Sequence, residues 1–134
     1  RGWMEVHCAD ENIKTALSSF CFPAFSEMPL GDVDVSITKC EVLVARTGSM
    51  VLSSTESSGR LTSVYAPIHI CIAKSSQLVY DIKDALEFMQ KKYGYQLRYP
   101  HPFATGPSRT ADIEKTLVVG VHGPKEVFCF LLDK

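Results

Sequence analysis

The stretch Ile68-His69-Ile70-Cys71-Ile72-Ala73 is apolar at every position except His69. This composition is typical of an interior strand in a sheet that is covered on both faces. We therefore expect His69 to be a hydrogen-bonded core residue rather than a ligand. Upstream, the residues from Val33 to Thr38 alternate strictly between apolar and polar. That alternation predicts a second strand, with one face in water.

Three helices are expected around these strands. Asp10 is a candidate N-cap, and apolar residues follow it at helical spacing. Asp81 begins the clearest helix, which has acidic residues in its first turn, basic residues in its last turn and a stop at Gly94. A third helix is predicted to begin near Ser108 and to run toward Gly120.

The other expected strands are Trp3–His7, Val42–Ala45, Met50–Leu52, Leu97–Ala104 and Val127–Leu132. The residues from Arg46 to Ser49 are predicted to form a hairpin turn. Pro100 and Pro102 either confine the strand before Thr105 to an edge or shorten it. The last strand is expected to be buried. The polar stretch from Ser53 to Gly59 should be exposed. Strands and helices alternate around one inserted hairpin, which predicts an α/β sandwich with a mixed sheet and helices on its faces.

Length and charge exclude several classes of protein. The chain has 134 residues, with 14 Lys and Arg against 15 Asp and Glu. This length suits one domain over residues 1–134, and the charge balance does not suggest a nucleic-acid or anionic-membrane binder. The longest apolar run is too short to cross a bilayer. Because the chain begins with Arg1 rather than methionine, we expect it to lack an N-terminal part of the native protein.

The cysteines indicate a reducing compartment and no resident cofactor. Five of them are spread through apolar segments without a C-x-x-C pair. Free buried thiols of this kind predict a cytoplasmic protein. An iron–sulfur cluster needs four closely organised thiolates, so we expect none in this chain. H-E-x-x-H, dinucleotide, P-loop and serine-hydrolase motifs are also absent, which argues against a dedicated metal site and against those enzyme classes.

Two segments are candidates for binding a small anion. In the first, Gly106 allows a tight turn, Ser108 or Thr110 can cap the predicted helix, and Arg109 offers a planar fork that suits a carboxylate or phosphate. Alternatively, Ser108 only caps the helix, Arg109 pairs with a neighbouring acidic residue and nothing binds. The second candidate is Thr47-Gly48-Ser49, whose hydroxyls either bind an acidic group or simply complete a hairpin.

Three residues are candidates for catalysis. Glu41 begins an apolar strand and is a base or nucleophile if it is buried, or an edge charge if it is not. His122 lies in a glycine-rich turn, where it is either an acid–base group near neutral pH or an ordinary loop histidine. Glu114 is a further candidate base or nucleophile in the Gly106 segment.

Four blocks of the sequence resemble one known family. The blocks run from Cys40 to Ser49, from Pro67 to His69, from Thr105 to Leu117 and from Gly120 to Glu126. The run G-P-S-R-T-A-D-I-E and the following G-x-H-G-P-K-E are long and specific. Together the blocks resemble the LUD-domain, or lactate-utilisation, family (DUF162), and within it the LutC/YkgG branch. Lys39 stands where a glycine is expected, and an N-terminal helical portion of the family is absent or shortened.

The resemblance implies a fold and a role. The fold is a three-layer α/β/α Rossmann-like sandwich, similar to the NagB/RpiA/CoA-transferase group. The role is in a three-part bacterial system that oxidises L-lactate to pyruvate, in which partner proteins carry the iron–sulfur clusters. Shared membership is an associational argument only, so three hypotheses remain.

In the first hypothesis, the chain is a subunit of a lactate-oxidising assembly and binds a small carboxylate at Arg109 and the predicted helix start. In the second, it is an enzyme by itself, a transferase or isomerase acting on a phosphorylated or CoA-linked acid, with Glu41 or Glu114 as base or nucleophile. In the third, it is a non-catalytic assembly or regulatory factor.

Overall fold

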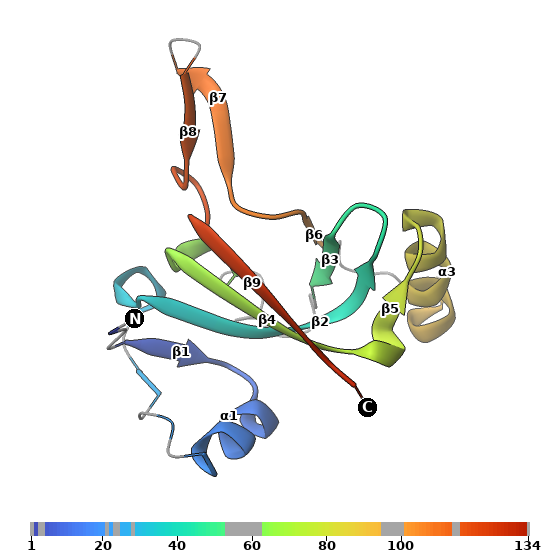
Figure 1. Cartoon of the computed structure of the whole chain (residues 1–134), viewed down its shortest axis with the longest axis horizontal. Helices are drawn as coiled ribbons and strands as arrows, with labels where there is room; N and C mark the ends of the chain where they lie inside the picture. Colours follow the sequence, from blue (N-terminus) through green and yellow to red (C-terminus); the bar gives the residue numbers. More distant parts are fainter. Residues whose placement is uncertain are drawn as a thin grey trace.

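One mixed sheet dominates the computed structural model, which describes residues 2, 5–20, 22, 25–27, 29–52, 63–94, 101–113 and 116–133. Its elements are β1 (Val6–Cys8), α1 (Glu11–Ser18), the 3-10 turn η1 (Leu30–Asp32), β2 (Val35–Val44), β3 (Ser49–Leu52), β4 (Ile68–Lys74), the 3-10 turn η2 (Ser75–Gln77), β5 (Leu78–Val79), α3 (Ile82–Tyr93), β6 (Phe103–Ala104), β7 (Arg109–Ile113), β8 (Thr116–Val119) and β9 (Glu126–Leu132). Seven strands form the sheet, in the order β6-β3-β2-β4-β9, with β1 and β5 also paired to β2 (Figure 1). The strands β7 and β8 form a separate pair.

The central strand is β2, which holds the sheet together. It runs parallel to β1, β4 and β5 and antiparallel to β3, so the predicted α/β fold with a mixed sheet is confirmed. The two strands predicted before and after Lys39 are one continuous strand with a bulge between Cys40 and Val42. The expectation of a wet face is wrong, because Ser36 on that face is fully buried and Asp34 and Thr38 are only partly exposed.

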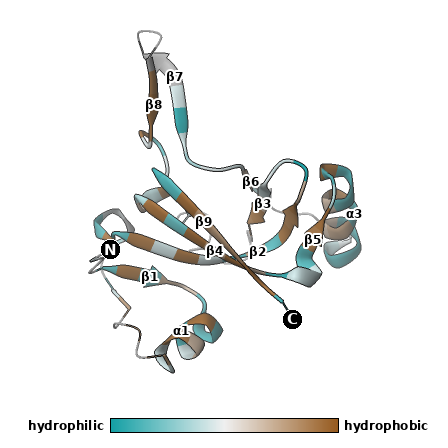
Figure 2. Ribbon diagram, in the orientation of Figure 1, coloured by the Kyte–Doolittle hydropathy of each residue, from teal (hydrophilic) through white to brown (hydrophobic). Residues whose placement is uncertain are grey.

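Three hydrophobic clusters pack on the sheet. Figure 2 shows that apolar residues are frequent along its strands. The first cluster contains Ile13 of α1, and the second contains Ala85 and Met89 of α3. The third contains only strand residues: Cys40, Leu43, Met50, Leu52, Cys71 and Ala73, with Ala104 and Val127 packed against them. The helices α1 and α3 begin as predicted, since the side chain of Asp10 accepts a hydrogen bond from the backbone of α1 and that of Asp81 from the backbone of α3.

The predicted third helix is wrong, because its residues form the antiparallel hairpin β7–β8. This hairpin projects away from the large sheet (Figure 1). The reason lies in the composition of the segment: Thr110, Ile113, Thr116, Val118 and Val119 are all β-branched. Such side chains are restricted in a helix and fit the pleated surface of a strand.

The C-terminal strand differs from expectation in burial but not in type. β9 is the edge strand beside β4, and Phe130, Leu131 and Leu132 are exposed on it, so the expected buried strand is wrong. Of the edge strand expected before Thr105, the described residues include β6, which pairs with β3 at the edge of the sheet. Residues 53–62 and 95–100 lie outside the described part, and with them the predicted polar stretch and most of that edge strand.

Candidate functional site

A cavity of about 400 Å³ lies where β6, the loop before β7 and the turn before β9 meet. It is lined by Leu52, Ser63, Val64, His69, Pro102, Phe103, Ala104, Gly106, Ser108, His122, Gly123, Pro124 and Val127. Three residues predicted to be functional, Gly106, Ser108 and His122, are therefore brought together from two separate segments. Its size and mostly apolar lining with a few polar groups are typical of small-molecule sites.

The wall that carries Ser108 and His122 is built by a tightly packed turn. The backbone N–H of Ser108 donates to the carbonyl of Pro124 at 2.9 Å, and that of Gly120 donates to the carbonyl of Ser108 at 2.9 Å. A Cβ atom at Gly123 would lie 2.8 Å from the Cβ of Ser108, so only glycine fits this close approach. Gly123 of the G-x-H-G-P-K pattern is thus required by packing against Ser108.

His69 forms the buried part of this cavity. It is 1% exposed, and its Nε2 lies 2.7 Å from the Thr38 hydroxyl. Burial lowers the pKa of His69 to about 4, so the ring is neutral near pH 7. The prediction of a hydrogen-bonded core histidine is confirmed, but the sequence did not indicate that this residue also lines a cavity, because nothing in a single strand shows which loops cover it.

The Thr47-Gly48-Ser49 turn reaches the same loop but not the cavity. The Ser49 hydroxyl, which is buried, lies 2.7 Å from the Thr47 hydroxyl and 2.7 Å from that of Thr105. Gly48 has a φ of +66°, as the turn between β2 and β3 requires. The hydroxyls therefore tether two loops, and their role in anion binding stays a prediction.

The predicted cradle at a helix start is wrong, since no helix begins there. Arg109 is exposed at the first position of β7, opposite Val119, and it is not among the residues that line the described cavity. Thr110 follows within the same strand, opposite Val118. Glu114 lies outside the described residues. Arg109, Thr110 and Glu114 stay predictions as functional residues.

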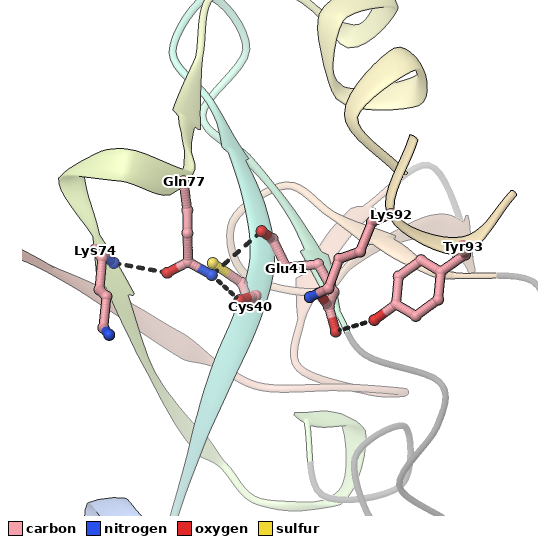
Figure 3. A network of polar contacts seen from close by, with 6 residues as sticks. All are labelled: Cys40, Glu41, Lys74, Gln77, Lys92 and Tyr93. Atoms are coloured by element: carbon pink, nitrogen blue, oxygen red, sulfur yellow. Dashed lines mark hydrogen bonds and ion pairs between the residues drawn. The ribbon is translucent and has the colours of Figure 1, made fainter. Parts of the chain in front are cut away.

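Glu41 is buried, with 8% of its surface exposed, but it is not among the residues that line the cavity. Figure 3 shows its polar contacts. It lies at the β2 bulge, where one carboxylate oxygen accepts a hydrogen bond from the Tyr93 hydroxyl at 2.8 Å and the other pairs with Lys92. The hydrogen bond with Glu41 raises the pKa of Lys92, whereas burial, followed by the same carboxylate, raises the pKa of Tyr93.

These contacts attach the end of α3 to the central strand. Gln77 supports the same bulge, because its side-chain amide donates to the carbonyls of Cys40 and Glu41 at 2.7 and 3.2 Å (Figure 3). A carboxylate held through both oxygens is a structural anchor in this arrangement. The predicted role of Glu41 as a base or nucleophile has not been tested.

Neither a metal site nor a membrane-spanning helix is found among the described residues. No group of three or more His, Cys, Asp or Glu side chains there is arranged to hold a metal ion. No helix in the same ranges is long and apolar enough to cross a membrane.

The fold defined above is shared with a solved protein. The crystal structure of a DUF162 family protein from Deinococcus radiodurans matches with a TM-score of 0.56 and 19% sequence identity, covering 98% of this chain and 88% of that chain. In sequence, the family model of the LUD domain matches residues 29–132. The chain therefore belongs to the LUD-domain family, as the resemblance predicted.

The chain also matches curated proteins named "Lactate utilization protein C". The one from Bacillus subtilis (strain 168) is 35% identical over 104 residues, which are 75% of this chain and 43% of that protein. The one from Deinococcus radiodurans is 30% identical over 106 residues, 78% of this chain and 49% of that protein. The chain thus spans less than half the length of these relatives.

Proposed function

We propose that this chain works in lactate utilisation and binds a small organic anion, of the 2-hydroxy or 2-oxo acid class, in the cavity beside His69. The proposal is supported by the relatives, whose shared name refers to lactate utilisation. One structural observation supports the proposed location of the binding site. Ser108 and His122, which come from different segments, line a single cavity of about 400 Å³.

The lining suits the chemistry of lactate. The Ser108 hydroxyl and the His122 imidazole can each donate a hydrogen bond to a carboxylate, which is stronger than a bond between neutral groups. Apolar residues such as Phe103 and Val127 offer surface for the methyl group. His69 is neutral near pH 7, so it adds a hydrogen-bonding group without adding charge.

The proposal places the chain in a bacterial, cytoplasmic system that oxidises L-lactate to pyruvate. That reaction releases two electrons, which iron–sulfur partner proteins accept in this scheme. The present chain is assigned the binding of the organic acid because Ser108 and His122 line one cavity. Glu41 is not given a catalytic role, since both of its carboxylate oxygens are held by α3.

A binding experiment tests the site. Purified protein is titrated with L-lactate, pyruvate and, for comparison, inorganic phosphate, and binding is followed by calorimetry. We expect saturable binding of the two organic acids, and a loss of roughly 10-fold or more in affinity for Ser108→Ala, which removes one hydrogen bond to a charged group. Lys83→Ala, which changes an exposed residue on α3, is the control and should bind normally.

Two outcomes would contradict the site: no saturable binding of either acid, or equal affinities for the Ser108→Ala and unchanged proteins. A growth experiment tests the role itself. The Ser108→Ala substitution is placed in the native gene, and growth on L-lactate should fail while growth on glucose continues. Arg109→Ala is tested in parallel, because the arginine is exposed outside the cavity and its role is a separate prediction. Growth on L-lactate after deletion of the whole gene would rule out the proposed role.

A further inference from the structure

A row of three thiols crosses the sheet on three neighbouring strands. Cys40 lies on β2, Cys71 on β4 and Cys129 on β9, and these strands are adjacent and parallel. Cys71 and Cys129 are register partners, directly opposite each other. Thr38 is the partner of Cys71 on β2, so Cys40, two residues further on, points to the same side of the sheet.

The row leads from the interior to the surface. Cys40 and Cys71 belong to the same hydrophobic cluster and are 3% and 0% exposed, whereas Cys129 is exposed on the edge strand. The thiol of Cys71 is in hydrogen-bond contact with both of its neighbours. The hydrogen bond with Cys40, together with burial, raises the pKa of Cys71, so this thiol is protonated at neutral pH.

The backbone spacing of the outer two thiols suits a disulfide. Neighbouring strands lie about 4.8 Å apart, and the Cα atoms of a disulfide are usually about 4.4–6.8 Å apart. Residues that are direct partners in a parallel pair also point their side chains in the same direction. Cys71 and Cys129 can therefore be joined without moving the strands, whereas Cys8 lies in a different cluster and has no such neighbour among the described cysteines.

We propose that Cys71 and Cys129 are a disulfide-forming pair and that peroxides reach it through Cys129. Burial raises the pKa of Cys129, so only a small share of this exposed side chain is thiolate at neutral pH and the reaction is faster in alkali. Through the thiolate, hydrogen peroxide oxidises Cys129 to a sulfenic acid and is itself reduced to water. The sulfur of Cys71 then attacks the sulfur of Cys129, the S–O bond breaks, and the hydroxyl leaves with the proton of Cys71 as a second water molecule. The new S–S bond links β4 to the edge strand β9. Two residues earlier on the same strands and on the same face, His69 and Val127 are register partners that line the cavity.

The experiment oxidises the fully reduced protein with a small excess of hydrogen peroxide and maps its peptides by mass spectrometry without reduction. We expect a peptide pair joined through Cys71 and Cys129, lighter by two hydrogen atoms than the separate peptides. Free thiols per chain, counted after unfolding, should fall from five by two, and dithiothreitol should restore them. Cys8→Ser, a matched buried control, should lose two thiols as well.

Because Cys129 is exposed, its substitution tests whether peroxide reacts first at this thiol. Cys129→Ser changes a surface side chain and should lose no thiol at the same peroxide dose, with an unchanged circular dichroism spectrum. Cys71→Ser should leave Cys129 as a sulfenic acid that dimedone traps. The proposal is overturned if the unchanged protein gives dimedone-labelled Cys129 without the cross-link, if Cys129 joins two chains, or if Cys129→Ser loses thiols as fast as the unchanged protein.

Discussion

The histidine beside the cavity should make the stability of the fold depend on pH. Burial lowers the pKa of His69 from 6.5 to about 4. Above 6.5 both the folded and the unfolded chain hold a neutral ring, and no free energy is lost. Below 6.5 the unfolded chain binds a proton that the folded chain does not, so stability falls with pH until the ring titrates in the folded state near 4.

The size of the pKa shift sets how much stability is lost. Each pKa unit corresponds to about 1.4 kcal/mol, so His69 lowers the free energy of unfolding by roughly 3 kcal/mol when the pH has fallen through the whole range. About 2 kcal/mol of this loss falls between about pH 7 and about pH 5. Urea unfolding at these two pH values measures it. The pH-dependent loss should be smaller by about 2 kcal/mol in His69→Gln, whatever the absolute stability of that variant.

The control is Ser108→Ala, which changes a side chain without an ionisable group at the same cavity and should keep the full pH dependence. Burial also lowers the pKa of His7, so this residue makes stability fall with pH in the same direction. The His69→Gln variant should therefore keep a smaller dependence of stability on pH. An unaltered slope after His69→Gln would refute the reasoning, because the proton uptake would then belong to other groups.

Three further substitutions test how the structure is held together, each measured by urea unfolding. Glu41→Gln keeps a hydrogen-bond acceptor but removes the charge that faces the half-exposed Lys92, so the free energy of unfolding should fall by about 1 kcal/mol; no change would mean that the pair adds nothing. Gly123→Ala should cost about 1–3 kcal/mol through overpacking. Gly31→Ala, where nothing lies within 4 Å, is the control, and an equal loss in both would contradict the packing argument. Ser49→Ala removes a buried hydroxyl with two partners and should cost about 1–2 kcal/mol, whereas a neutral effect would show that the loops are tethered by other contacts.

Local patterns were enough to identify the helices and the central strands. The residues from Asp81 to Gly94 form the predicted helix with its expected caps, because a capping carboxylate, helical spacing and a glycine stop all act within a few residues of one another. The apolar run Ile68–Ala73 lies within β4 for a similar reason, since continuous apolar sequence suits only a position inside the sheet. The same logic failed at residues 109–119, where spacing suggested a helix and β-branched side chains favoured a hairpin.

The sequence by itself determined the family, the mixed α/β fold and the identity of most candidate residues, since these depend on short-range patterns and on runs of residues such as G-P-S-R-T. Only the tertiary structure decided which candidates meet. It joined Ser108 to His122 across one cavity, held Glu41 against α3 and left Arg109 exposed. It also aligned Cys71 with Cys129, which lie far apart in the chain. The physical reason is that strand register and loop packing are long-range properties, set by how hydrophobic faces are buried against each other.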